Sequence, residues 1–262
     1  MKHQFNPSYE EYRKILRNIR QSGKYMDYRE AAEADCFIIL RHDIEFSVER
    51  AYRMSLIEKE EGIASTYFVQ ITSNAYNAFS QKNMEMLKRM IQNGHRIGLH
   101  YHLGTNLTCS HITHEIQTQV RVLSDFLEYD VDRFSIHRPT EASHYYEIQV
   151  DGVINAYSKE FFTHVEKVNE NSQMEVKYIA DSKHQWNYGY PDMNTIKRFP
   201  KIQLLIHPYS WAEIGCGIAD TFCTIADEKE KEALNDFDEE TKIYCLVKQE
   251  VEKRRKRWDI KM

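Results

Sequence analysis

The chain of 262 residues lacks paired cysteines and long apolar runs. Its five cysteines form no CxxC pair, so we expect neither a zinc ribbon nor a disulfide scaffold. No stretch approaches the length of a membrane span, and residues 1–7 contain no apolar segment typical of a signal peptide. We therefore expect a protein of the reducing cytoplasm without a membrane span.

An excess of positive charge is also missing. The formal net charge is −5, which argues against general binding to nucleic acid or anionic membranes. The basic run at residues 253–257 is better explained as the last turn of a helix, where cations complement the helix dipole. We expect no nucleic-acid partner.

Apolar stretches alternate with segments of helical periodicity. The expected strands are 36–40, 65–71, 95–99, 132–137 and 202–207, and the expected helices between them are 48–61, 81–92, 111–129 and 193–199. This alternation predicts parallel βαβ units, and about seven strands favour a barrel or incomplete barrel over an open sheet. We expect one α/β domain over residues 1–262, with an N-terminal helix at 7–32 and a charged helical tail at 228–262.

Ionisable groups gather where the expected strands end. The first strand leads into Asp43 and Glu45, and the third leads into His100 and His102. Members of each pair are two residues apart, so an extended backbone points both to one side. Carboxylates and imidazoles are the ligands expected for zinc or another divalent first-row metal. Because alternating α/β folds place chemistry at the carboxyl ends of their strands, we expect an enzyme with a metal site.

Five short motifs follow one another along the chain. They are Leu40-Arg41-His42-Asp43-Ile44-Glu45-Phe46, Gly94-His95-Arg96-Ile97-Gly98-Leu99-His100, Ile136-His137-Arg138-Pro139, Asp181-Ser182 with Trp186, and Leu205-Ile206-His207-Pro208. In this order they resemble the NodB-type polysaccharide deacetylases (carbohydrate esterase family 4). The resemblance covers residues 36–211 and is closest to deacetylases of O-antigen and other surface-glycan loci. It implies a distorted (β/α) barrel and metal-dependent hydrolysis of an N-acetyl group.

The first motif departs from the family pattern. Two acids are usually adjacent there, whereas Ile44 separates Asp43 from Glu45. The resemblance implies that Asp43 is the general base and Glu45 a metal ligand, and an exchange of these two roles stays open. Arg138 is expected to orient the base and keep it ionised.

The second motif departs as well. Its histidines are usually four residues apart, but Gly104 stands four residues after His100. The second imidazole ligand must come from elsewhere, and His137 and His102 are the candidates. We favour His137, because His102 resembles a rim position.

The expected reaction is the removal of an acyl group, acetyl first, from an amino sugar. One divalent ion, zinc ahead of cobalt, nickel or manganese, polarises the acyl oxygen and activates a water. His207, held in the right tautomer by Asp181, protonates the leaving amine.

Candidates for contact with the sugar are His102, Trp186, Tyr209 and Trp211, since tryptophan can stack on a sugar ring. The expected substrate is a nucleotide- or lipid-linked amino sugar from surface polysaccharide biosynthesis. Other enzymes of glycan biosynthesis are candidate partners.

Two other functions fit the same residues. The altered motifs suit a catalytically silent barrel that binds glycan or scaffolds a glycan-assembly complex. The same site also suits a hydrolase or amide-transferring enzyme acting on another C–N bond, such as a uronamide. Metal analysis separates the scaffold from the enzymes, and acetate release separates the two enzyme activities.

Overall fold

The structure, a computed structural model, describes residues 5, 7–163, 175–186 and 188–259. The chain divides into two compact units, residues 1–216 and 217–262. All strands among the described residues belong to the first unit. No helix in the described ranges is both long and apolar enough to cross a membrane.

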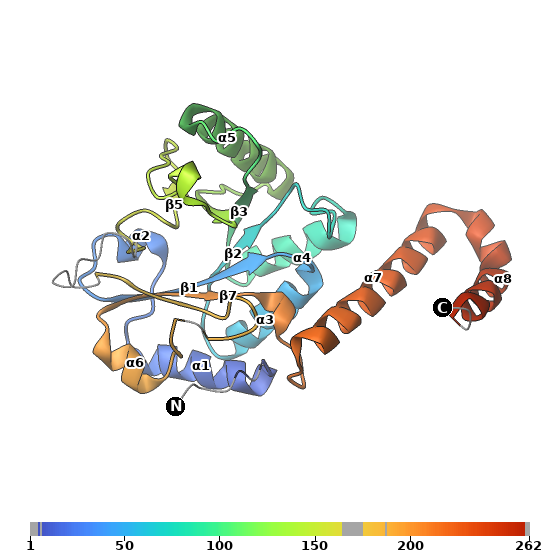
Figure 1. Cartoon of the computed structure of the whole chain (residues 1–262), viewed down its shortest axis with the longest axis horizontal. Coiled ribbons are helices and arrows are strands. Elements are labelled where there is room, and N and C mark those ends of the chain that lie inside the picture. Colours follow the sequence, from blue (N-terminus) through green and yellow to red (C-terminus); the bar gives the residue numbers. More distant parts are fainter. Residues whose placement is uncertain (1–4, 6, 164–174, 187, 260–262) are drawn as a thin grey trace. The chain divides into compact units, whose positions relative to one another are not determined.

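Seven parallel strands form one sheet in the order β5-β4-β3-β2-β1-β7-β6 (Figure 1). Their bounds are β1 Phe37–Ile44, β2 Thr66–Val69, β3 Arg96–His102, β4 Arg133–His137, β5 Ile154–Asn155, β6 Lys177–Ala180 and β7 Lys201–Ile206. The sheet curls on itself, so that β7 faces the segment just beyond β5 across the interior. There, Gln203 Nε2 donates to the carbonyl oxygens of Ala156 and Phe161 at 2.8 and 2.9 Å. The predicted fold class, a distorted (β/α) barrel of about seven strands, is confirmed.

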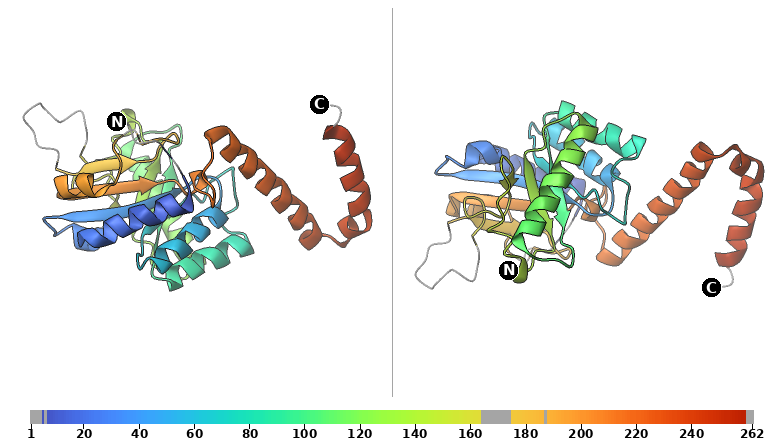
Figure 2. Two further views of the ribbon diagram at one scale, coloured as in Figure 1. Left: turned by 90° about the horizontal axis from the view of Figure 1, so that it is seen from below. Right: turned by 90° about the horizontal axis from the view of Figure 1, so that it is seen from above.

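Helices cover the outer face of this sheet (Figure 2). The helices of the first unit are α1 Tyr9–Ser22, α2 Tyr28–Ala31, α3 Val48–Glu60, α4 Gln81–Gln92, α5 Cys109–Leu127 and α6 Met193–Arg198. Ser47 caps α3, and its side chain accepts a hydrogen bond from the backbone N–H of Arg50. Apolar residues of α1, α3, α4 and α5 pack on the outward side chains of the strands and form the main core.

The inside of the barrel changes character along the strands. One end of the interior is closed by apolar side chains, where Phe37 and Ile39 of β1 and Phe68 of β2 pack with the buried Tyr28. Toward the carboxyl ends of the strands, the inward positions are polar, and these positions form the site described below. The space between strands is narrow at Gly98, where an added Cβ would lie 2.5 Å from Phe68 Cδ1, so β3 needs glycine two residues before His100.

The predicted N-terminal helix at 7–32 is two helices in the structure. α1 ends at Ser22 because Gly23 adopts a left-handed conformation, with φ of 67°. Asp27 then caps the short helix α2. The helical periodicity of the sequence did not reveal this break.

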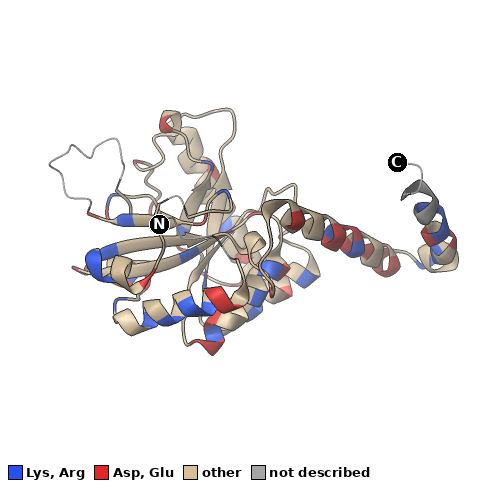
Figure 3. Cartoon of the chain, turned by 60° about the horizontal axis from the view of Figure 1, so that its bottom comes forward, with Lys and Arg blue, Asp and Glu red and all other residues tan. Residues whose placement is uncertain are grey.

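The second unit consists of two helices, α7 Ile218–Glu240 and α8 Lys242–Asp259. Acidic residues gather along α7, whereas α8 carries the basic run (Figure 3). Lys248 of α8 pairs with Asp238 of α7, and the rings of Phe237 and Tyr244 lie 5.4 Å apart. The predicted charged tail, 228–262, falls in this unit, and its residues 260–262 lie outside the described residues.

Candidate active site

Strand β1 brings an ion pair into the barrel. Arg41 and Asp43 are two residues apart, so both point inward, and both are buried. Arg41 Nη2 donates to Asp43 Oδ2 at 2.7 Å, and Arg41 Nη1 donates to Gln203 Oε1 at 3.2 Å. Burial alone raises the pKa of Asp43, but the Arg41 guanidinium outweighs burial and lowers that pKa to about 2. Asp43 is therefore ionised at neutral pH.

Ser135 on β4 connects Asp43 to His100 on β3. Its Oγ donates to Asp43 Oδ1 at 3.4 Å and lies 2.7 Å from His100 Nδ1. A hydroxyl carries one proton, so the proton between Ser135 and His100 is assigned to the imidazole Nδ1. This tautomer leaves the lone pair of His100 Nε2 free to bind a cation.

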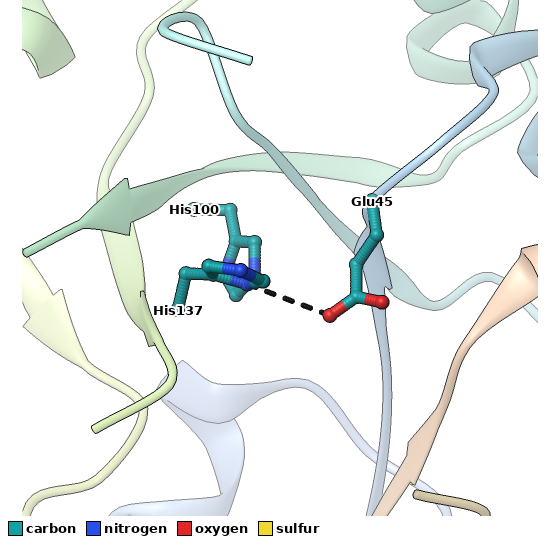
Figure 4. A group of neighbouring side chains, drawn as sticks. All are labelled: Glu45, His100 and His137. Carbon is teal, nitrogen blue, oxygen red and sulfur yellow. Dashed lines mark hydrogen bonds and ion pairs between the residues drawn. The ribbon is translucent and has the colours of Figure 1, made fainter. Parts of the chain in front are cut away.

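The three predicted metal ligands come together at the carboxyl ends of the strands (Figure 4). Glu45, His100 and His137 each offer one ligand atom, and these atoms lie within 4.8 Å of one another. His137 Nδ1 lies 3.1 Å from His100 Nε2 and 3.4 Å from Glu45 Oε1. When two ligand atoms each lie about 2.1 Å from one ion, they are about 3.0 Å apart at an octahedral ligand–metal–ligand angle and about 3.4 Å apart at a tetrahedral one. Both distances fit a shared ion.

The electrostatics of the three ligands also fits a cation. Burial lowers the pKa of His100 to about 3 and that of His137 to about 4, so both imidazoles are neutral at neutral pH. Burial raises the pKa of Glu45, and a bound cation would compensate its charge. Two neutral imidazoles and one carboxylate form a ligand set that suits zinc.

Strand β7 leads into a second acid–imidazole pair. His207 Nδ1 lies 2.6 Å from Asp181 Oδ1, and Trp211 Nε1 donates to Asp181 Oδ2 at 2.8 Å. Burial by itself lowers the pKa of His207, but the Asp181 carboxylate outweighs it and raises the pKa to about 9. His207 is therefore protonated at neutral pH and can donate a proton.

A cavity of about 490 Å³ joins these groups, and Asp43, Glu45, His100, His137 and His207 all line it. Its volume is in the range of small-molecule sites. Much of the remaining wall is aromatic and consists of Tyr145, Tyr157, Phe162, Tyr178, Tyr188 and Tyr209. Tyr209, a predicted substrate contact, thus borders the same cavity as the acids and imidazoles.

The two predicted tryptophan contacts lie elsewhere. Trp211 is 1% exposed and donates to Asp181, so its buried ring offers no face to a sugar. The prediction that Trp211 stacks on substrate is wrong. Trp186 packs against the core beside Trp211, with 6.4 Å between ring centroids, and is outside the set of described residues that line the cavity.

His102 and Arg138 differ from their expected places. His102 is exposed, and its ring lies 5.1 Å from that of His137, outside the group of candidate ligands. Arg138 lines the cavity, but the guanidinium that pairs with Asp43 is that of Arg41.

Arg41 and Ser135 are the site residues that the sequence analysis missed. Arg41 precedes Asp43 by two positions, so the alternation that placed Asp43 and Glu45 on one side also applied to it. Ser135 precedes His137 by two positions on β4 in the same way. Both could have been found by extending the inward-facing positions back along each strand.

Comparison with known proteins gives structural similarities alone. No protein-family model and no curated protein matches the chain. A family 4 carbohydrate esterase from Streptococcus mutans is 12% identical, with a TM-score of 0.46, over 85% of this chain and 91% of that one. A family 4 pseudoenzyme from Bacillus anthracis is 15% identical, with a TM-score of 0.39, over 77% of this chain and 62% of that one.

A third similar structure is the chitin deacetylase from the fungus Colletotrichum lindemuthianum. It is 17% identical, with a TM-score of 0.32, over 38% of this chain and 44% of that one. The chain thus spans less than half of the fungal structure and less than two thirds of the pseudoenzyme. Because the sequence identities and TM-scores are this low, the function has to be inferred from the side chains of the site.

Proposed function

We propose that the protein is a metal-dependent carbohydrate N-deacetylase of the NodB type. The observation that carries this proposal is the meeting of three groups in one cavity: the ligand set Glu45, His100 and His137, the ionised Asp43, and the protonated His207. A ligand set, a base and an acid are the parts that hydrolysis of an amide needs.

Asp43 is the proposed general base, and Arg41 keeps it ionised. A carboxylate with a pKa of about 2 is a weak base, so the attacking water has to be acidified. Glu45, His100 and His137 would hold a divalent ion, which would supply this acidity and polarise the acyl carbonyl. Of the candidate metals we propose zinc, because of the ligand types.

His207 is the proposed general acid. Water adds its oxygen to the acyl carbon and gives a proton to Asp43, and the C–N bond breaks as His207 gives a proton to the amine nitrogen. Asp181 holds His207 at Nδ1, so Nε2 is the atom that donates. The products are an amino sugar and a carboxylic acid, which then loses its remaining proton to solvent.

The substrate we propose is an acetamido sugar linked to a nucleotide or a lipid, used in surface-glycan synthesis in the cytoplasm beside other enzymes of that synthesis.

The test is release of acetate from acetamido sugars by the zinc- or cobalt-loaded protein. Asp43→Asn should lower turnover by about 10²- to 10⁴-fold while metal content stays near one ion per chain. Metal content is measured by elemental analysis and acetate by a coupled assay. A chain that binds glycan but releases no acetate from any acetamido sugar is a silent scaffold, and release of ammonia instead indicates a uronamide-type hydrolase.

A further inference from the structure

Two cationic side chains line the cavity and form no ion pair with any residue in the described ranges. Arg138 follows β4, and Lys183 follows β6 near the opposite edge of the curled sheet. Both residues are exposed. Within the described part of the chain, neither forms a hydrogen bond or an ion pair. We call Arg138 and Lys183 the cationic pair.

The acids of the cavity form no contact ion pair with Arg138 or Lys183 among the described residues, although the charge of Arg138 acts on Glu45 and opposes the rise of its pKa. Among the described residues that line the cavity, the acids are Asp43 and Glu45. Asp43 is already paired with Arg41, and Glu45 belongs to the candidate ligand group. The charges of the cationic pair are therefore available to an anion that enters from solvent.

Both cations stand on an unusual backbone. Arg138 has φ of 50° and Lys183 has φ of 60°, the left-handed region that is unfavourable for residues with a Cβ. Backbone of this kind is concentrated at binding and catalytic sites, where the surrounding structure holds it in place. Of the five non-glycine residues with positive φ in the described ranges, these two line the cavity.

We propose that Arg138 and Lys183 bind a phosphate or diphosphate group of the substrate. Guanidinium binds phosphate oxygens in a bidentate manner, and ammonium adds a compact charge. The inference rests on the proposed deacetylase function and names the residues that bind the phosphate of its substrate. A neutral glycan would leave both cations unpaired.

The first experiment measures kcat/KM of the metal-loaded full chain for four probe substrates. They are N-acetylglucosamine, its 1-phosphate, a nucleoside-diphosphate-linked form and a polyprenyl-diphosphate-linked form. We expect kcat/KM at least ~10-fold higher for the phosphorylated probes, which corresponds to one good charge contact or more. This preference should shrink at high salt, because the pair is exposed. The last two probes distinguish a nucleotide source from a lipid source.

The variant Arg138→Gln/Lys183→Gln should bring the ratio of kcat/KM between phosphorylated and neutral probes close to one. Lys88→Gln is the matched control, because Lys88 is on α4 and pairs with Glu128 outside the barrel. If the double variant does not fold, each single variant should reduce the ratio in part. A wild-type chain without preference, or a preference that survives both substitutions, overturns the inference.

A binding measurement separates this inference from the proposed function. Calorimetry with the metal-free chain and N-acetylglucosamine 1-phosphate avoids direct binding of phosphate to a metal ion. We expect binding that is at least ~10-fold weaker in the double variant. Binding without acetate release from any probe would leave the phosphate site standing and remove the deacetylase. Acetate release with equal affinity for neutral and phosphorylated sugar would support the deacetylase and remove the phosphate site.

Discussion

The two faces of strand β1 carry two different clusters of ionisable side chains. Asp43 points inward to the candidate site, whereas its neighbour His42 points outward beneath the helices. We call the polar groups of the candidate site the inner cluster; they are Asp43, Glu45, His100, Ser135, His137 and His207. On the outer face, His42 Nε2 lies 2.6 Å from Glu58 Oε1, and Ser65 Oγ donates to Glu58 Oε2 at 2.6 Å. His95 Nδ1 lies 3.3 Å from the same carboxylate. We call these residues the outer cluster.

The clusters resemble each other in composition but differ in access. Side chains of His42 and Glu58 are 0% exposed, whereas Glu45 is 20% and His137 is 12% exposed. Burial alone raises the pKa of Glu58, but His42 and His95 outweigh it and hold that pKa well below its usual range. The inner cluster lines a cavity, and the outer one is enclosed by protein. Acids and histidines on a strand therefore indicate a site only where a ligand can reach them.

The largest difference is expected from removing one imidazole of the inner cluster. His100→Ala should abolish stable metal binding and lower turnover by ~10³-fold or more, because two ligands remain. Elemental analysis and acetate release measure both effects. His95→Gln in the outer cluster is the control, and it should keep the metal. Full metal content in the His100 variant would show that the ion binds elsewhere.

Glu58→Gln tests the outer cluster. The substitution removes the buried carboxylate that accepts hydrogen bonds from Ser65 and Tyr12. Because buried polar groups then lose their partner, we expect the free energy of unfolding to fall by about 1 to 3 kcal/mol. Turnover per folded molecule should stay within about twofold of wild type. Urea denaturation gives the stability, and kinetics at low temperature gives the turnover. A metal-depleted or slow but stable protein would contradict a purely structural role.

The apolar run at residues 36–40 predicted the start of β1 but not its end. The structure continues the strand to Ile44, since Arg41 and His42 find buried partners on opposite faces. The change from apolar to polar residues therefore marked the transition from core to site within one strand. The alternation of a strand predicts which residues share a face, so Asp43 and Glu45 could be grouped correctly.

Partners across the sheet could not be predicted in the same way. Neither the pairing of His42 with Glu58 nor that of Trp211 with Asp181 is encoded in local spacing, because 16 and 30 residues separate the partners. The aromatic residues around the last motif favoured a role for Trp211 in stacking on a sugar ring. Only the tertiary structure shows that its ring is buried.

The next effect concerns the pH dependence of the inner cluster. His207 has its pKa raised from 6.5 to about 9, so its charged form stabilises the fold below about pH 6.5, and this stabilisation is lost as pH rises through about 9. As the general acid, it should give turnover an alkaline limb near pH 9. Asp181→Asn removes the largest contribution that opposes burial and leaves only those of Glu45 and Asp43, so that limb should move to lower pH. The pH profile of kcat/KM measures the shift, and His207→Ala should remove the limb altogether.

The smallest and most closely matched difference is expected from two serines. Ser135 links His100 to Asp43 in the inner cluster, and Ser65 links His95 to Glu58 in the outer one through its hydroxyl and backbone N–H.

Ser135→Ala removes the hydrogen bond that sets the tautomer of His100, so metal affinity should fall by about 10- to 100-fold. Ser65→Ala leaves one oxygen of Glu58 without its donor, so stability should fall by about 1 to 3 kcal/mol while metal affinity stays unchanged. Zinc titration against a competing chelator and urea denaturation give both values for each variant. Equal losses of metal affinity in the two variants would mean that the faces of β1 are coupled, and access to the cavity would then not be what separates them.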